Sequence, residues 1–282
     1  MIDETIEEIR EMQTHSSSVV AVKATNALTD LLDREYTTVE EFERDLERNT
    51  GALRRANPSH ASLHNAMREV TRSVVGRADT VDSAKKITRS TIERVVEDVE
   101  GGKHRAAENA AAAFDGGETL FTHDYSSTVL EGIELAAADG KAFTAYVTEA
   151  RPRYLGRKTV RSLVDIDGVE PHLLVDGACG EFLGEADRVV VGMDCIVEDT
   201  LYNRVGTFPL VVTANYLDVP VTVVGSGAKI ITDGFVFENE HRPGYEVLLE
   251  PTEGVEIENP AYDATPVDLV DEIVTDDGVR EI

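Results

Sequence analysis

Two aspartates that follow apolar runs are the residues of this sequence best suited to acid–base chemistry. Asp124 follows TLFTH directly, and Asp194 follows RVVVGM. If the two carboxyl groups approach each other, the pKa of one rises and the pair can donate and accept protons in one reaction. The competing interpretation is structural: Asp194 caps a turn and Asp124 caps a helix that starts near residue 126.

Basic and polar side chains near other apolar runs are suited to binding an anion. Asn203 and Arg204 precede Val-Gly-Thr, the expected start of a helix, where an arginine and backbone amides favour a phosphate. The densest basic cluster of the sequence lies in EARPRYLGRK and includes Arg151. Each of these arginines is equally well explained as a surface charge that balances nearby acids.

Three further polar residues stand at or near expected strand ends. Ser126 belongs to a short polar group and is a candidate for binding phosphate. Lys229 ends VVGSGAK, which has the glycines and the lysine of a phosphate loop but lacks the Gly-Lys-Ser/Thr ending of a nucleotide P-loop. His123 is expected to form hydrogen bonds rather than bind a metal, because no second histidine is close in sequence. We expect neither a metal nor an organic cofactor.

The first third of the chain shows the spacing of amphipathic helices. Apolar residues recur at intervals of three and four in TTVEEFERDLERNTGALRRA and STIERVVEDVE. One helix is expected to have Ser59 as its N-cap, and another to end at Gly101-Gly102. A further helix is expected to close with the alanine run at 110–113.

Five short apolar runs in the rest of the chain predict strands. They recur at similar intervals, separated by stretches that can form helices: TLFTH, AFTAYVTE, PHLLVD, DRVVVGMD and VPVTVVGS. This alternation predicts an α/β fold with a mostly parallel sheet and helices on both faces. Ligands of such sheets bind at the carboxyl ends of the strands, where the polar residues described above stand. We expect a helical domain over 1–114 and a sheet domain over 115–282.

Charge is the strongest global feature, with 54 acidic against 27 basic residues and a net charge of −27. Acids spread over the whole chain, with few lysines, are typical of proteins dissolved in concentrated salt, so we expect a halophilic, cytoplasmic protein. This charge repels phosphate backbones, and direct binding of nucleic acid is not expected. No apolar run approaches the roughly 20 residues of a membrane span. We expect the two cysteines to be reduced thiols.

Three long segments are similar to one known family: THDYSSTVLEGIELAAADGKAFTAYVTEARPRYLGRK, ADRVVVGMDCIVEDTLYNRVGTFPLVVTANYLDVPVTVVGSGAKI and ENPAYDATPVDLVDEIVT. They resemble the family that joins the alpha, beta and delta subunits of translation initiation factor 2B to isomerases of ribose 1,5-bisphosphate and methylthioribose 1-phosphate. The resemblance covers 115–276 well and the helical first third more loosely. It implies a Rossmann-like C-terminal domain and homodimers or larger homo-oligomers, and it leaves translation initiation proteins open as partners.

The resemblance also assigns a catalytic pair, of which one member is substituted. The isomerases carry a cysteine after Thr-His and an aspartate in a Gly-Ala-Asp segment, and these two residues are implied to move the protons of an aldose–ketose conversion. In this sequence the aspartate is Asp194, whereas Asp124 stands in place of the cysteine. Activity is therefore not inherited directly, although a carboxylate is able to act as a general base.

Phosphate-binding positions of the family are partly kept. Asn203 matches an Asn-Lys pair whose lysine is here Arg204, and Arg151 and Lys229 match basic positions of the bisphosphate enzyme. An N-terminal Arg-Gly motif is replaced by THSSS, and the arginine of a later Arg-Pro-Thr is replaced by Asn57. These losses weaken a site for a bisphosphate.

Two hypotheses follow. The first is an initiation-factor-2B-like protein that binds a phosphorylated small ligand, either a sugar phosphate or a nucleotide, with catalysis unproven. The alternative is an aldose–ketose sugar-phosphate isomerase that uses Asp194 and Asp124 as its acid–base pair. A guanine-nucleotide-exchange role is the weakest reading, since nothing in the sequence supplies its chemistry.

Overall fold

The computed structural model describes residues 2–10, 17–58, 60–232, 234–250 and 252–282. The chain divides into two compact units, each made of two segments. The first unit comprises Met1–Gly102 and Ala228–Glu238, and the second comprises Lys103–Gly227 and Asn239–Ile282.

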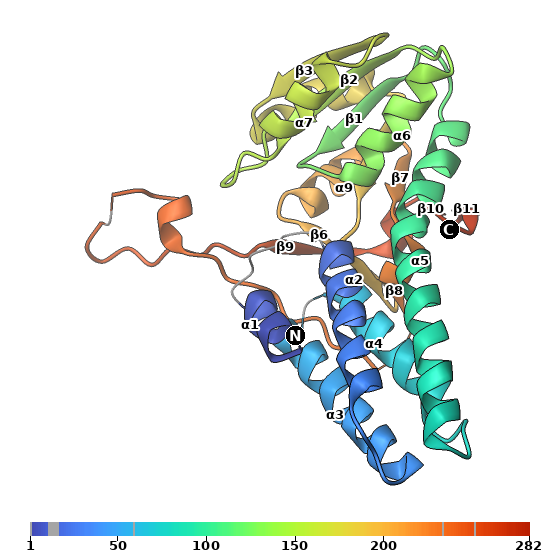
Figure 1. Ribbon diagram of the computed structural model, residues 1–282. Coiled ribbons are helices and arrows are strands. Elements are labelled where there is room, and N and C mark those ends of the chain that lie inside the picture. The colour runs from blue at the N-terminus through green and yellow to red at the C-terminus, as the bar shows by residue number, and fades with distance from the viewer. Residues whose placement is uncertain (1, 11–16, 59, 233, 251) are drawn as a thin grey trace. The chain divides into compact units, whose positions relative to one another are not determined.

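The first unit is built from helices (Figure 1). Its elements are α1 (Ile2–Arg10), α2 (Ser17–Ala27), the 3-10 helix η1 (Leu28–Asp33), α3 (Val39–Ala56), α4 (Ala61–Val74), the first part of α5 (Val81–Ala113) and the short strand β8 (Ile230–Ile231). Phe42, Leu46 and Leu53 of α3 are fully buried, and their spacing places them on one helical face. The helical character predicted for this part of the chain is thus confirmed.

The helix expected to end at Gly101-Gly102 does not end there. α5 runs without interruption to Ala113, so this prediction is wrong, whereas the end at the alanine run is confirmed. Each glycine costs a helix about 1 kcal/mol relative to alanine, a cost that tertiary packing of the flanking turns readily offsets. α4 begins at Ala61 after His60 as N-cap, and Ser59 lies outside the described residues.

The second unit contains a seven-stranded sheet with the order β11-β10-β7-β4-β1-β2-β3 (Figure 1). All neighbouring pairs are parallel except β10 and β11. The strands are β1 (Thr119–His123), β2 (Phe143–Thr148), β3 (Val169–Leu174), β4 (Arg188–Gly192), β7 (Val221–Val224), β10 (Glu272–Thr275) and β11 (Gly278–Glu281). All five predicted strands are present, and the mostly parallel sheet is confirmed.

Helices pack on both faces of this sheet. They are α6 (Ser127–Ala138), α7 (Gly156–Val164), α8 (Cys179–Phe182) and α9 (Thr207–Tyr216), together with the end of α5. Leu120 packs with Ile133 of α6 on one face. The next residue, Phe121, points to the opposite face. There it lies near Tyr146, whose ring is 5.5 Å from that of Phe182 in α8.

The order of the strands creates a switch point between β1 and β4. From β1 the chain proceeds outward through β2 to β3, and then returns to the other side of β1 to form β4. The connections on the two sides of this point diverge and leave a crevice at the carboxyl ends of β1 and β4, which is where open α/β sheets bind ligands.

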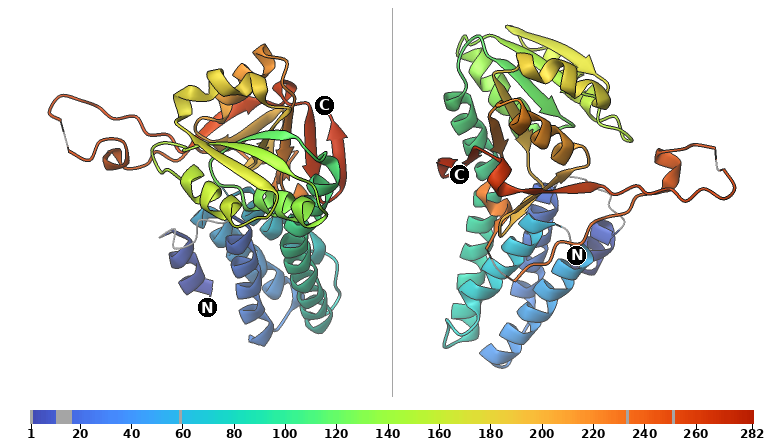
Figure 2. Two further views of the ribbon diagram at one scale, coloured as in Figure 1. Left: turned by 90° about the horizontal axis from the view of Figure 1, so that it is seen from above. Right: turned by 180° about the vertical axis from the view of Figure 1, so that it is seen from behind.

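A second, smaller sheet follows β4 and was not predicted. Strands β5 (Cys195–Val197), β6 (Thr200–Arg204) and β9 (Tyr262–Pro266) pair antiparallel. In this register Arg204 lies opposite Tyr262. The segment between β8 and β9 includes residues 239–250, which extend away from the sheets of the second unit as an arm (Figure 2).

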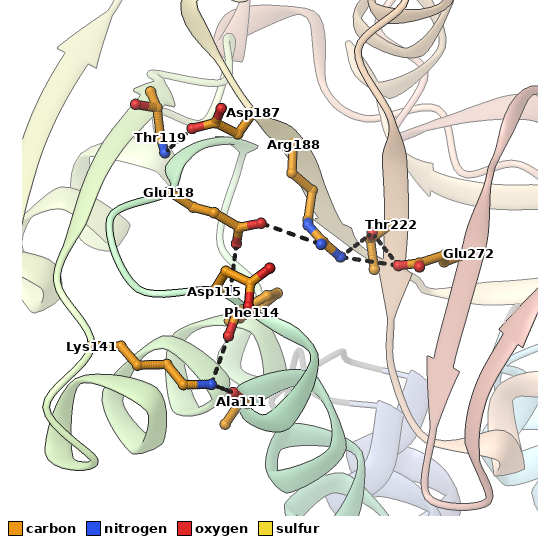
Figure 3. A network of polar contacts seen from close by, with 10 residues as sticks. All are labelled: Ala111, Phe114, Asp115, Glu118, Thr119, Lys141, Asp187, Arg188, Thr222 and Glu272. Carbon is orange, nitrogen blue, oxygen red and sulfur yellow. Dashed lines mark hydrogen bonds and ion pairs between the residues drawn. The ribbon is translucent and has the colours of Figure 1, made fainter.

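At the amino ends of the strands of the large sheet, one arginine joins its own strand, β4, to three others (Figure 3). Arg188, at the start of β4, donates to the carboxylates of Glu118 at 3.3 Å and Glu272 at 3.0 Å, and to the hydroxyl of Thr222 at 3.3 Å. Its side chain is only 15% exposed. This network therefore ties β1, β4, β7 and β10 together at their amino ends. Among the described residues, no helix is long and apolar enough to cross a membrane.

Candidate functional site

The switch point brings Asp124 and Asp194 to one guanidinium. Asp124 follows β1 directly, and Asp194 comes two residues after β4. The Nε atom of Arg204 lies 3.6 Å from Oδ2 of Asp124 and 3.4 Å from Oδ2 of Asp194. Both carboxyl groups therefore face a shared space at the carboxyl ends of neighbouring strands.

Asp124 is not the cap of the helix that follows it. Ser126 is the N-cap of α6, and its hydroxyl accepts from the backbone N–H of Val129 at 3.3 Å. Asp124 adopts the left-handed conformation, with φ of 63°, which aspartate tolerates better than most residues. Its carbonyl oxygen accepts from the hydroxyl of Thr159 at 2.5 Å. The backbone is thus anchored and its carboxyl group is left to face Arg204.

Burial changes the protonation of Asp124, which is 5% exposed. Removal from water raises the pKa of this carboxyl group, and the nearby charge of Asp194 raises it further. The positive charge of Arg204 opposes the shift without cancelling it. Asp124 consequently retains its proton to higher pH than an ordinary aspartate.

This raised pKa predicts a pH-dependent stability difference between wild type and Asp124→Asn. The stabilising contribution of a protonated Asp124 is fully present below the pKa of the unfolded chain, near 3.9, and is lost as pH rises through the higher pKa of the folded state. Asparagine does not titrate. The free energy of unfolding of wild type, relative to the variant, is therefore expected to fall as pH rises above about 4. Denaturant titrations of both proteins at several pH values above 4 measure this difference in the free energy of unfolding. A difference that does not change with pH would contradict the raised pKa of Asp124.

His123 is fully occupied by structural hydrogen bonds, as expected. Its Nδ1 lies 2.6 Å from the hydroxyl of Thr148, and its Nε2 lies 2.8 Å from the carbonyl oxygen of Val205. Because a carbonyl only accepts, Nε2 carries the proton and donates. Gly206 packs against this ring with φ of 106°, and an added Cβ would lie 2.6 Å from it. The close approach requires glycine at this position.

Arg204 has partners on three sides. Besides the two aspartates, its guanidinium carbon lies 4.9 Å from the centre of the Tyr262 ring. The negative charge of Asp194 raises the pKa of Arg204 against the opposing effect of burial. Arg204 therefore stays charged and holds the two carboxyl groups, a role that sequence reasoning, which assigned it to phosphate, did not foresee.

The helix expected after Asn203-Arg204 is present as α9, but its first amides are already occupied. The carboxylate of Asp263 accepts from the backbone N–H groups of Gly206 at 2.7 Å and Phe208 at 3.0 Å. Asn203 is buried and donates to the hydroxyl of Thr207 at 3.1 Å. The side chains of Asp263 and Asn203 are thus both used to stabilise the start of α9.

Arg151 lies in a loop after β2 whose conformation is fixed by one carboxylate. Asp176 accepts from the backbone N–H groups of Ala150 and Arg151, both at 2.7 Å. The exposed guanidinium of Arg151 donates to the carbonyl oxygen of Val247 at 3.1 Å. Asp176, the last residue of the run PHLLVD, thus shapes this loop.

A pocket at the carboxyl edge of the sheet gathers several of these groups. It is a narrow, open hollow: the space between its lining atoms amounts to about 320 Å³ with open solvent included, but only about 20 Å³ of it admits the centre of a water molecule. The residues that line it are Asp124, Ala150, Arg151, Pro152, Arg153, Leu155, Arg204, Val205, Arg242, Asn259, Pro260 and Ala261. Four arginines and one aspartate thus surround one hollow, which suits an anionic ligand.

Arg242 and Asn259 were missed by sequence reasoning. They come from the arm and from its return to β9, with no apolar run beside them to signal a strand end. Arg242 donates to Glu246 at 2.6 Å and to Glu240 at 2.8 Å. The carboxylate of Glu246 also accepts from the amide of Asn259 at 3.3 Å. Only the folded arm brings these residues to the pocket.

Four candidates are not among the residues that line this pocket: Asp194, which contacts Arg204 from the end of β4, Asn203, Ser126 and Lys229. Ser126 packs against Gly192 at the switch point, where an added Cβ on the glycine would lie 2.5 Å from the serine hydroxyl oxygen. Lys229 closes the 3-10 helix η4 (Gly227–Lys229) and belongs to the first unit, whereas the other candidates belong to the second. The segment that replaces the N-terminal Arg-Gly motif falls mostly on 11–16, outside the described residues. Within the described part of the chain, no group of three or more His, Cys, Asp and Glu side chains is placed to hold a metal ion.

The fold and the site define an α/β protein whose strand-end crevice combines two carboxyl groups with several arginines. Comparison with solved structures shows the same fold. The chain belongs to the Initiation factor 2 subunit family, whose model matches residues 13–281. The family expected from the sequence is thereby confirmed.

Curated relatives and solved structures match nearly the whole chain. A ribose 1,5-bisphosphate isomerase from Haloterrigena turkmenica is 33% identical, with 97% of this chain and 88% of the relative covered. A protein of the same name from Haloferax volcanii is 30% identical, with 97% and 87% covered. The crystal structure of a translation initiation factor eIF-2B from Pyrococcus horikoshii OT3 superposes with a TM-score of 0.78 at 26% identity, covering 99% of this chain and 96% of that one.

Proposed function

We propose that this protein is an aldose–ketose isomerase that acts on a phosphorylated pentose of the ribose 1,5-bisphosphate type. The observation that carries the proposal is the pair of carboxyl groups, from the ends of β1 and β4, that share the guanidinium of Arg204 at 3.6 and 3.4 Å. The names of the two halophilic relatives support the choice of substrate. This reading is favoured over a protein that only binds a phosphorylated ligand.

The two aspartates have different environments and so take different roles. Conversion of an aldose to a ketose moves hydrogen between neighbouring carbons and needs one group that accepts a proton and one that donates it. Asp124 is buried, and its raised pKa suits a proton donor. The side chain of Asp194 is 24% exposed and pairs more closely with Arg204, which suits the ionised base. Two carboxyl groups held in different states thus supply the acid and the base.

The arginines around this pair supply the affinity for phosphate. Arg151 and Arg153 line the pocket beside Asp124. Guanidinium groups bind phosphate through parallel charge-assisted hydrogen bonds. An acidic protein with a net charge of −27 that gathers arginines in one hollow is suited to select a small anion and to bind it locally.

The competing function is a binding protein without turnover. It is favoured by the same Arg204 contact, because an arginine between two carboxylates favours their ionised forms and weakens the acid. In this reading the crevice holds a sugar phosphate or nucleotide, and the protein acts through association with other chains, with translation initiation proteins as its partners.

Turnover by the wild-type protein separates the two functions. Purified protein is incubated in molar KCl with ribose 1,5-bisphosphate and, separately, with methylthioribose 1-phosphate, and the ketose product is followed by NMR. We expect conversion of the bisphosphate at an ordinary enzymatic rate, on the order of 1–10³ per second. Absence of conversion of either substrate would reject the isomerase and leave the binding function.

We also propose that the protein is a homo-oligomer of a salt-rich cytoplasm. Three apolar residues at four-residue spacing form an exposed stripe on α9: Phe208 and Val212 are each 42% exposed, and Tyr216 is 85% exposed. Such stripes mark surfaces that another chain covers. Light scattering in molar KCl measures the mass in solution, and a monomer would contradict the proposal.

A further inference from the structure

The guanidinium of Arg153 is the one lining charge of the pocket that has no oxygen partner within the described residues. Arg153 lies in the loop after β2 and is half-buried. A guanidinium carries five N–H donors, and keeping it away from water without partners costs free energy. An arginine in this state indicates hydrogen-bond donors that are reserved for a ligand.

The other arginines of the pocket already have oxygen partners. Arg242 is neutralised by two glutamates, whose oxygens lie 2.8 and 2.6 Å from its nitrogens. Arg204 is shared by the two aspartates, and Arg151 donates to a backbone carbonyl. Arg153 therefore contributes a positive charge that no side chain in the described part of the structure balances by direct contact.

The local electrostatics favour an anion beside Arg153. Burial lowers the pKa of Arg153, and repulsion by Arg242 and Arg204 lowers it further, whereas the weaker effects of the Glu246 and Asp124 carboxylates raise it. Although the residue stays charged at neutral pH, this crowding of three positive groups raises its free energy. A phosphate placed among them relieves the repulsion and satisfies the free donors at the same time.

The backbone of the loop holds Arg153 in a fixed position. Asp176 accepts from two successive amides at the start of the loop, as described above. At its end, Gly156 approaches β2 so closely that an added Cβ would lie 1.8 Å from the carbonyl oxygen of Thr148. A rigid loop loses little conformational entropy on binding, so its arginine is preorganised.

We propose that Arg153 donates to the phosphate group of the ligand in this pocket and selects phosphorylated over unphosphorylated sugars. The inference rests on the proposed function only in assigning a sugar phosphate to the pocket. The planar fork of a guanidinium matches two phosphate oxygens, which gives geometric specificity as well as affinity. Arg153 is a binding residue in this scheme, and the proton transfers remain with the two aspartates.

Calorimetric binding of ribose 5-phosphate tests the proposal without relying on turnover. In molar KCl, Arg153→Gln is expected to weaken binding about tenfold to a hundredfold, the range of a charge-assisted hydrogen bond. Arg153→Lys keeps the charge but not the planar guanidinium, so its affinity is expected to lie between those of wild type and Arg153→Gln. The matched control is Arg157→Gln, because Arg157 belongs to the same basic cluster but pairs with Glu149 at 2.6 Å. The affinity of Arg157→Gln for ribose 5-phosphate is expected to equal that of wild type.

The outcomes separate this inference from the proposed function. Wild-type affinity in Arg153→Gln, or an equal loss in Arg157→Gln, would overturn the role of Arg153 whatever the turnover assay gives. Failure of the wild-type protein to bind ribose 5-phosphate or inorganic phosphate would overturn it as well. A selective loss in Arg153→Gln, in a protein that converts no substrate, would uphold the inference while rejecting the isomerase.

Discussion

Asp194→Asn is expected to abolish isomerisation of ribose 1,5-bisphosphate while the protein remains folded. An amide cannot accept a proton from carbon, and loss of a general base typically lowers the rate by about 10²–10⁴. Affinity is expected to change little, because the arginines that line the pocket are untouched. Initial rates over a range of substrate concentrations should therefore show a fall in kcat with nearly constant KM.

Retention of the fold follows from the surroundings of Asp194. Its side chain is partly exposed, and Arg204 keeps its contact with Asp124 at 3.6 Å when the other carboxylate is neutralised. The control is Asp139→Asn, which neutralises an exposed aspartate at the C-terminal end of α6. Rates for Asp194→Asn that match those of this control would show that Asp194 is not the base.

Arg188→Ala is expected to destabilise the protein more than any surface substitution. Arg188 is 15% exposed, and it faces Glu118, which is 13% exposed, and Glu272, which is 30% exposed. Removal of the arginine leaves two carboxylates of low exposure without their cation. Breaking a buried pair in this way costs about 3–5 kcal/mol. The free energy of unfolding from denaturant titration is the measurement.

The control for this prediction is an ion pair at the surface of the first unit. Arg94 lies 2.5 Å from Glu69, but the two side chains are 50% and 41% exposed. Exposed pairs contribute about 0–1 kcal/mol, and molar salt, with a Debye length of about 3 Å, screens them further. Arg94→Ala should therefore have a small effect that shrinks with added KCl, whereas the effect of Arg188→Ala should persist. Equal losses in the two variants would refute the importance of the Arg188 network.

Much of the second unit could be predicted because its strands are local features of the sequence. Each run of apolar residues in a buried parallel strand is continuous, and the polar residue that ends it marks the edge of the sheet. Asp124 and Asp194 were found in this way. β5, β6 and β9 were not, because each has at most five residues and mixes buried with partly or fully exposed positions, too few to show a period.

Helix boundaries were less predictable for a related reason. The Gly101-Gly102 pair has a strong local preference to end a helix, yet α5 continues through it. The low helix propensity of glycine costs about 1 kcal/mol per residue. Burial of Ala106, Ala107 and Ala110 in the next turns of α5 outweighs this cost, since all three are fully buried. Local preference decides a boundary only where tertiary contacts are weak.

By itself the sequence determined the family, the mostly parallel sheet and the aspartates at two strand ends. Only the tertiary structure decided that these aspartates share Arg204, that Asp263 occupies the first amides of α9, and that Arg153 faces the pocket without an oxygen partner among the described residues. Hydrophobic periodicity is a local property that can be read along the chain. Ion pairing and burial depend on which strands become neighbours and where the arm returns, and these are fixed only when the whole chain packs.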